Sequence, residues 1–238
     1  MQRLKAVLTL LAAVAFLLSP LLSSGFNGFS PGQFPIPQID PPVQPAGYAF
    51  SIWGLIYLAL IAGAVFGVIK RANHPDWDAA RWPLIASLVV GAAWIPVANR
   101  SVLVATILIW IMLVTAVVAL IAAGKGDRPW LRSPIALYAG WLTAASSVAL
   151  GLVLAGYGWV GGTTAAVLCI SLALVIAVTV QVVRSDTPEY SVAIIWALIG
   201  VVVSNLDPMS WIVLGLCGVG IAVLGVVASR QYVRATRG

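Results

Sequence analysis

Long apolar segments alternate with short polar ones along the whole chain. Each apolar segment holds about 17–25 residues, which is enough for one helix to cross the hydrocarbon core of a bilayer. Backbone polar groups find no partners in lipid, so each segment is expected to be helical. We expect eight membrane-spanning helices, at roughly 5–23, 48–69, 82–99, 102–123, 134–155, 159–183, 190–206 and 209–228.

The composition supports an all-α, polytopic membrane bundle. Of the 238 residues, 61% are hydrophobic and only 8% are charged, whereas a soluble domain carries about 25% charged residues. The lipid bilayer is therefore the first partner that we expect. The formal net charge of +6 does not predict nucleic-acid binding, because the basic residues lie in short turns and form no stripe that could follow phosphates.

The basic residues also predict the orientation of the chain. If the N-terminus is cytoplasmic, the cytoplasmic segments contain 12 of the 13 Lys and Arg residues, and the external segments contain only Arg100. Positive charge is retained on the cytoplasmic side during insertion. We therefore expect both termini in the cytoplasm and a location in the plasma membrane, specifically a bacterial inner membrane.

The first span and the segment after it each allow two interpretations. A basic start followed by an apolar run resembles a signal peptide cleaved near Ser24 or Gly25. That run is long for a signal peptide and no small-residue cleavage motif follows it, so we expect a retained helix. The external segment 23–47 holds six prolines and no basic residue. We interpret it as a semi-rigid lid, the alternative being a passive linker.

Groups that usually carry catalysis or ion coupling are missing from the predicted spans. All seven acidic residues fall in loops or at span ends, and no Lys or Arg lies mid-span, whereas pumps and coupled transporters keep an ionisable group at membrane depth. The single histidine, His74, lies in a predicted cytoplasmic turn, and Cys169 and Cys217 fit small buried residues. We expect no catalytic residues, no metal site and no required cofactor.

Tryptophan is in excess, with ten residues. Those in turns or at span ends fit the interfacial aromatic belt, whereas five lie within predicted spans: Trp53, Trp94, Trp110, Trp141 and Trp196. Trp53 and Tyr57 have the spacing of one helix face, as do Tyr138, Trp141 and Ala145. Such faces either line a cavity for a large planar ligand or pack between helices.

Three segments resemble one family in order and spacing. They are PAGYAFSIWGLIY (45–57), GAAWIPVANRSVLVATILIW (91–110) and LYAGWLTAA (137–145). The chain is similar to the tryptophan-rich sensory proteins, the TspO/MBR family, which are related to the mitochondrial translocator protein. The similarity covers roughly residues 1–156 as a five-helix core. Residues 157–238 are expected to add three helices and a short basic cytoplasmic tail.

The resemblance implies a pocket that opens towards the first loop and binds porphyrins, haem-like tetrapyrroles or sterols. The positions assigned to ligand binding are Pro45, Trp53, Tyr57, Trp94, Trp110, Tyr138, Trp141 and Ala145. The chain departs from the family pattern at Gly91 and Ala149, where the family has asparagine, and at Leu137, where it has proline. The two missing amides remove hydrogen-bond anchors, so the identity of the ligand does not transfer from the family.

The leading hypothesis is a membrane receptor or sensor that binds an apolar planar ligand, a porphyrin or another tetrapyrrole. The alternative is an uncoupled carrier or exporter of a hydrophobic metabolite. A third hypothesis is an enzyme that acts on the bound ligand, for instance by the light- or oxygen-dependent porphyrin breakdown suggested for the family. A hydrophobic small molecule is the expected partner in each case. A second copy of the chain, forming a homodimer, is a further possible partner.

Overall fold

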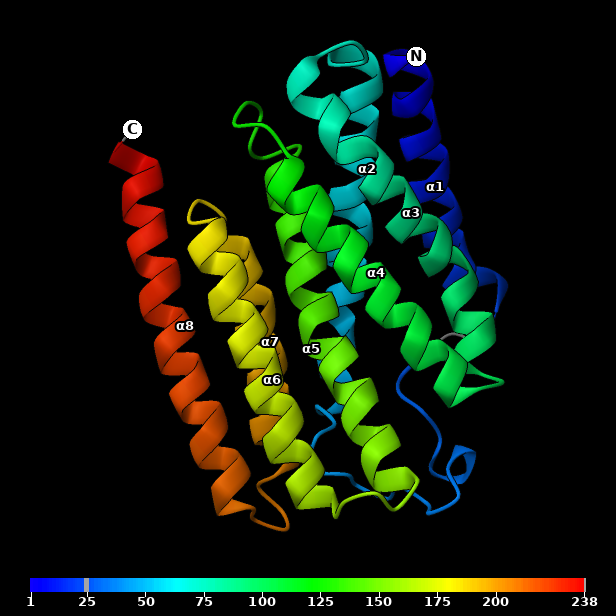
Figure 1. The fold of residues 1–238 in the computed structure, drawn as a ribbon, viewed down its shortest axis with the longest axis vertical. Coiled ribbons are helices and arrows are strands. Elements are labelled where there is room, and N and C mark those ends of the chain that lie inside the picture. The colour runs from blue at the N-terminus through cyan, green and yellow to red at the C-terminus, as the bar shows by residue number, and fades with distance from the viewer. Residues whose placement is uncertain (24–25, 238) are drawn as a thin grey trace.

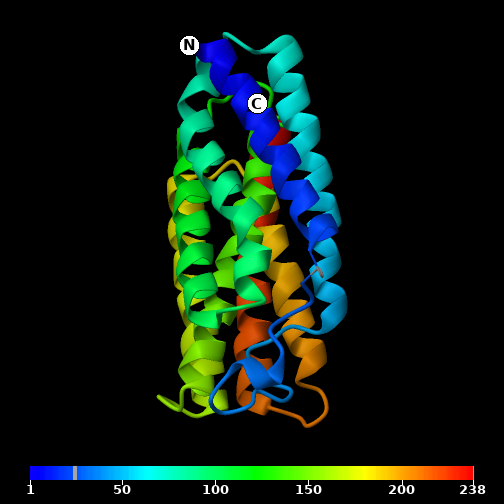
Figure 2. The same cartoon turned by 90° about the vertical axis from the view of Figure 1, so that its right-hand side faces the viewer.

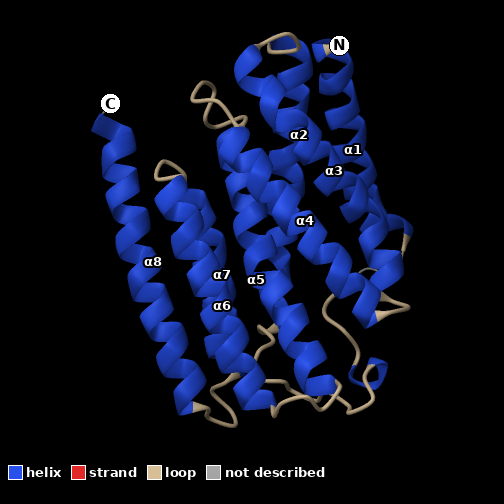
Figure 3. Ribbon diagram, viewed as in Figure 1, coloured by secondary structure: helices blue, strands red, loops and turns tan. Residues whose placement is uncertain are grey.

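The computed structural model describes residues 1–23 and 26–237, and its regular elements are helices (Figures 1 and 3). They are α1 (Gln2–Leu22), η1 (Pro31–Gln33), η2 (Gly47–Ser51), α2 (Ile52–Lys70), α3 (Pro75–Ala98), α4 (Val102–Ala122), α5 (Arg132–Gly156), α6 (Gly162–Val183), α7 (Pro188–Ser204) and α8 (Trp211–Arg237), where η marks a short 3-10 helix. The predicted all-α bundle is confirmed. The alternative cleavage near Ser24 or Gly25 lies outside the described residues.

The helix lengths fit membrane crossing. Within the described residues, seven helices are long and apolar enough to cross a bilayer, and α7 is apolar but has only 17 residues. The third helix begins at Pro75 rather than near residue 82. Proline suits the first turn of a helix, and the His74 ring accepts a hydrogen bond from the Asp76 amide at 3.3 Å. Charged residues in this first turn hid the helix start from the apolar pattern.

Helix α5 lies at the centre of the bundle (Figure 1). Helices α2 and α4 contact it from one side and α6 and α7 from the other, while α8 packs outside α6 and α7. In its most apolar stretch 78% of α5 is buried, against 22% for α8. The boundary predicted between residues 156 and 157 falls at the end of α5, and one continuous core extends from α1 to α8.

Two glycines allow neighbouring helices to pack in backbone contact on opposite sides of α5. A Cβ atom at Gly140 of α5 would lie 2.3 Å from the carbonyl oxygen of Tyr190 in α7. A Cβ atom at Gly63 of α2 would lie 2.3 Å from the carbonyl oxygen of Trp130, just before α5. Small residues allow such close packing between membrane helices. The Tyr190 hydroxyl lies 2.6 Å from the Thr143 hydroxyl of α5, which fixes α7 further.

Ion pairs connect the helices at the end of the bundle where α1 begins and α8 ends, here the terminal end (Figure 1). Lys5 of α1 pairs with Asp78 of α3 at 2.8 Å, and Arg128 pairs with Glu189 of α7 at 2.7 Å. Most basic residues gather at this end, whereas Arg100 lies between α3 and α4 at the other end. The segregation of charge follows the predicted pattern, and the cytoplasmic orientation stays a prediction.

The proline-rich loop (residues 26–46) crosses the opposite end of the bundle, here the loop end (Figure 2). Its side chains Phe29, Phe34 and Val43 are buried. The Ile36 amide donates a hydrogen bond to the carbonyl oxygen of Gly156, at the end of α5, at 2.9 Å. The loop is therefore a packed cover over this end, and its role as a lid is taken up below.

Asp127, in the loop before α5, connects the terminal ends of three helices. Its Oδ2 atom lies 2.6 Å from Nε of Arg71, which follows α2, and accepts a hydrogen bond from the indole of Trp77 in α3 at 3.1 Å. The Arg71 hydrogen bond is the main reason that the pKa of Asp127 falls below its ordinary value. Since folding lowers this pKa, the carboxylate stabilises the fold at neutral pH and loses that effect as the pH falls through the lowered value.

We expect Asp127→Asn to lower the thermal unfolding temperature at pH 7 by a few degrees. The difference from the unsubstituted protein should shrink as the pH is lowered and vanish below the pKa of Asp127, where both side chains are neutral. Thermal unfolding in detergent across this pH range measures it. Asp40→Asn, in the exposed part of the proline-rich loop, is the control. A difference that stays constant with pH would show that the charge is not its cause.

Candidate functional site

Two neighbouring cavities lie beneath the proline-rich loop. The loop-end cavity, of about 40 Å³, is enclosed by Gln44 and Pro45 of the loop, one face of α5, and Ala197 of α7. The α1 cleft, of about 240 Å³, lies between α1, α2, α3 and α4. Four residues border both spaces and separate them: Phe26, Phe50, Trp94 and Ile109. The two cavities are therefore halves of one site.

The aromatic side chains of the site pack around Phe16 of α1. The centroid of the Phe16 ring lies 5.7 Å from that of Trp53 and 5.0 Å from that of Tyr57, both edge-to-face. Tyr138 lies 5.7 Å from Phe16 as well, and Trp53 stacks on Tyr57 at 5.5 Å. These are preferred distances for aromatic pairs. In this conformation the cluster is packed core rather than an open chamber.

Phe16 occupies space that Gly91 leaves free on α3. A Cβ atom at Gly91 would lie 2.6 Å from the Phe16 ring and 3.0 Å from the methyl carbon of Met112. The resemblance to the family predicts asparagine at this position, whereas this chain has glycine and an apolar ring lies against it. Ala149, at the other missing asparagine, lines the loop-end cavity. The walls of the loop-end cavity are accordingly mostly apolar, whereas Asn27 and Tyr57 add polar groups to the α1 cleft.

Trp141 supplies the one polar group in these walls that stands out. Trp94 donates its indole N–H to the carbonyl oxygen of Ala105 at 2.9 Å, and the Tyr138 hydroxyl lies 3.0 Å from that of Ser87. Trp141 is 1% exposed, yet its N–H has no acceptor among the described residues. A buried donor without a partner costs roughly 1–3 kcal/mol. A molecule in the loop-end cavity with an acceptor atom near Trp141 would remove that cost.

The structure brings most of the residues predicted for ligand binding to this site. Those that line one or both cavities are Pro45, Trp53, Tyr57, Trp94, Trp141 and Ala145. Tyr138 is fully buried one layer deeper, against Phe16 and Trp53. The helical spacing predicted which faces of α2 and α5 turn inward.

Trp110 is placed elsewhere. It lies with Ile107 and Leu150 in an apolar groove on the outer surface of α4 and α5. The preceding residue, Ile109, faces the site, and successive residues of a helix point about 100° apart. The motif that contains Trp110 therefore identified its helix but not the face on which its side chain lies.

Several residues of the site were not predicted from the sequence. Phe16 and Phe50 lie in or beside apolar runs, where no spacing distinguishes them from lipid-facing residues. Phe26 is in the proline-rich loop, where no helical pattern applies. Ala197 belongs to α7, in the part of the chain to which the sequence assigned no role. Only the tertiary structure brings these residues together.

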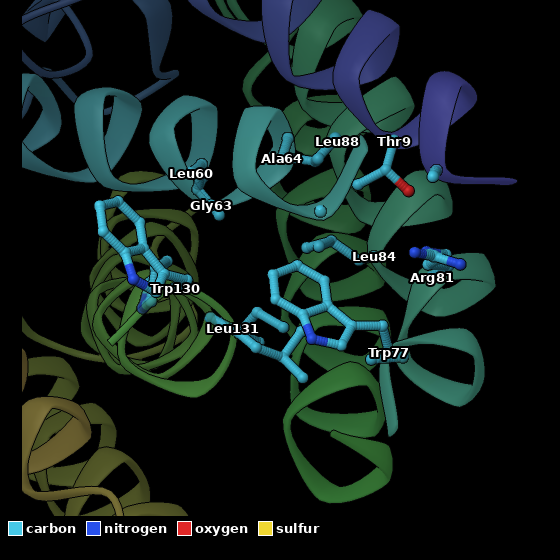
Figure 4. Close-up of a pocket in the computed structure, with 15 residues that line it drawn as sticks. Thr9, Leu60, Gly63, Ala64, Trp77, Arg81, Leu84, Leu88, Trp130 and Leu131 are labelled. Atoms are coloured by element: carbon cyan, nitrogen blue, oxygen red, sulfur yellow. The ribbon is translucent and has the colours of Figure 1, made fainter. Parts of the chain in front are cut away.

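A third cavity, of about 30 Å³, lies nearer the terminal end between α1, α2, α3 and the start of α5 (Figure 4). Figure 4 shows Trp77 and Trp130 below the ribbon of α2, with Arg81 on the side of α1. The Arg81 guanidinium donates to the carbonyl oxygens of Arg71 and Ala72 at 2.8 Å each, which ties α3 to the turn that follows α2. The described residues contain no group of three or more His, Cys, Asp or Glu side chains that could hold a metal ion.

An all-helical bundle apolar enough to cross a bilayer, with an aromatic site beneath a loop at one end, defines the class: a polytopic integral membrane protein. A family model described as TSPO-like protein matches residues 6–229. The chain therefore belongs to the TSPO-like family, and the match extends through α6, α7 and most of α8. Membership supports a membrane protein of the sensor or transporter type. No curated protein and no solved structure matches the chain.

The packing around Phe16 predicts a large loss of stability when its ring is removed. We expect Phe16→Ala to lower the free energy of unfolding by about 3–5 kcal/mol, as for other buried aromatic residues, and Phe16→Leu to cost clearly less. Equilibrium unfolding in mixed micelles measures both, with Leu58→Ala, at a side chain 69% exposed, as the control. If Phe16→Ala were as mild as the control, the aromatic cluster would not be a packed core.

Proposed function

We propose that this protein is a membrane receptor for an apolar, planar ligand of the tetrapyrrole class, bound in the joined loop-end cavity and α1 cleft. The observation that carries the proposal is the unpaired N–H of Trp141, a residue in the wall of the mostly apolar loop-end cavity. The rings of Trp53 and Trp94 offer flat faces against which a macrocycle can stack. A carboxylate or carbonyl substituent of the ligand would accept the Trp141 hydrogen bond.

Binding such a ligand requires the site to enlarge. The loop-end cavity has room for a few water molecules at most, whereas small-molecule sites have about 300–1,000 Å³. The rings of Phe26 and Phe50 separate it from the larger cleft, and their displacement would join the two. Phe26 lies in the proline-rich loop and Phe50 in η2. Movement of the cover would displace these two rings, whereas Trp94 and Ile109, which also separate the two spaces, belong to α3 and α4.

Titration with protoporphyrin IX tests the proposal. We expect saturable quenching of tryptophan fluorescence in the purified protein. Trp141→Phe keeps an aromatic ring but removes the donor, so Kd should rise about fivefold, which corresponds to one hydrogen bond of ~1 kcal/mol. Trp110→Phe, on the outer groove, is the matched control and should leave Kd unchanged. Quenching without saturation, or equal weakening by both substitutions, would contradict the receptor proposal.

A second function, an uncoupled carrier of hydrophobic metabolites, is favoured by the cavity near the terminal end. That cavity lies between α1, α2, α3 and the start of α5, and the first three of these helices also border the α1 cleft. In the carrier proposal, the aromatic layer of Phe16, Tyr57 and Tyr138 is the barrier between the two spaces. Among the described residues, no carboxylate side chain lines either space, and Arg81 is the charged residue in the cavity near the terminal end. A ligand that passed this aromatic layer would therefore meet no acidic group in either cavity.

Flux measurements separate a carrier from a receptor. In proteoliposomes that contain trapped apomyoglobin, a carrier should deliver external haem faster than protein-free liposomes do. Phe16→Leu, which thins the aromatic layer, should raise this rate at least severalfold, and Leu58→Ala on the outer surface should not. Saturable binding without any protein-dependent flux would exclude the carrier function and leave the receptor function standing.

A further inference from the structure

The second half of the proline-rich loop and the short helix η2 are bound to α7. The Ala46 amide donates a hydrogen bond to the carbonyl oxygen of Gly200 at 3.0 Å. The indole N–H of Trp196, one turn earlier in α7, donates to the carbonyl oxygen of Ala49 at 2.8 Å. The Trp196 ring also lies edge-to-face against Tyr48 at 5.6 Å. These contacts join segments that are about 150 residues apart in the chain.

The end of α7 adds two side-chain hydrogen bonds to the same stretch. The Ser204 hydroxyl donates to the carbonyl oxygen of Gln44 at 2.7 Å, and the Asn205 side-chain amide donates to that of Pro42 at 2.9 Å. Asn205 is 3% exposed, and its Nδ2 atom also lies 2.9 Å from the carbonyl oxygen of Val201. Every second residue from Pro42 to Ala46 therefore makes a hydrogen bond from its main chain to the end of α7.

This attachment places the wall of the loop-end cavity. Gln44 and Pro45 line the cavity together with Ala197 of α7. A Cβ atom at Gly200 would lie 2.9 Å from the Cβ atoms of both Pro45 and Ala49, so α7 and the loop meet without space for a larger residue. The position of this wall is therefore set by α7, a helix beyond the first five.

The first half of the proline-rich loop is bound to different helices. Gln33 donates its side-chain amide to the carbonyl oxygen of Ala98 at the end of α3, at 2.9 Å. The Ile36 amide bonds to the end of α5, as described above. The two halves are therefore held by different sets of hydrogen bonds, although both line the loop-end cavity and they meet where Gly28 faces the Gln44 side chain. Release from α7 would free the part of the wall formed by Gln44 and Pro45.

Helix α7 is itself held firmly. Its start contacts the α5 backbone at Gly140, and its outer side is covered by α6 and α8. A Cβ atom at Gly220 of α8 would lie 2.8 Å from Leu174 of α6 and 3.0 Å from Leu198 of α7. The three helices after α5 thus form a unit that presents the loop-binding face of α7 in a fixed place.

We propose that α7 is the latch of the lid: Trp196, Ser204 and Asn205 are positioning residues that hold residues 42–49 closed over the loop-end cavity and so limit the rate of ligand entry. The part of this proposal that concerns a ligand rests on the proposed function. The closure of the loop does not, because it follows from contacts within the chain. The latch also gives the last three helices a role in the site.

Amide hydrogen exchange tests the latch without any ligand. In the full chain in nanodiscs, the double substitution Ser204→Ala, Asn205→Ala should accelerate exchange across residues 42–49 at least tenfold, since each hydrogen bond contributes about fivefold to the closed state. Trp196→Phe keeps the ring against Tyr48 and removes only the donor, so it tests the latch independently. Gln33→Ala is the matched control and should accelerate exchange in residues 30–38 instead. Unchanged exchange of residues 42–49 in both latch variants would overturn the proposal.

Stopped-flow binding of protoporphyrin IX to the same variants tests the effect on entry. The association rate should rise severalfold in the latch variants, and the dissociation rate should rise with it. Accelerated exchange with unchanged binding rates would overturn the role of the latch in entry. A third outcome is that exchange accelerates in the latch variants but even the unsubstituted protein binds no protoporphyrin. That result would overturn the tetrapyrrole proposal and support α7 as the element that closes the loop.

Discussion

The burial of α5 on both sides is the constraint on which the rest of the structure depends. In lipid a helix satisfies its own backbone hydrogen bonds, so its position is set by how closely neighbouring helices can pack. Gly140 allows α7 to contact the α5 backbone, while another face of α5 carries Trp141 and Ala145 into the loop-end cavity. One helix therefore both forms the wall of the site and seats the helix that holds the cover.

This arrangement connects the site to α8, a helix that does not line the loop-end cavity. Helix α8 supports α7, α7 binds the loop, and the loop closes the cavity. Within that space the unpaired N–H of Trp141 is a local cost that an acceptor atom on a ligand would remove. Phe16 fills the neighbouring volume with an apolar ring. The aromatic side chains around the α1 cleft are closely packed, and a large ligand would have to displace some of them.

Sequence patterns predicted the helices and part of the site because those features depend on residues close together in the chain. The spans follow from local hydropathy, and the shared face of Trp53 and Tyr57 follows from their four-residue spacing. Phe16 could not be recognised, because its partners lie on three other helices. The bond from Trp196 to Ala49 joins residues 147 positions apart, so its existence depends on the packing of α7 and not on any local motif.

The central claim is that the proline-rich loop is a movable cover that α7 holds closed and that opens for a ligand to enter. Spin labels at Gly47, where a Cβ atom would meet nothing within 4 Å, and at Leu206 after α7, which is exposed, allow the distance between the two segments to be measured by pulsed electron resonance in nanodiscs. The account predicts a main short distance with a minor longer population, and loss of that longer population when protoporphyrin IX is added. A single distance that does not respond to protoporphyrin would contradict it.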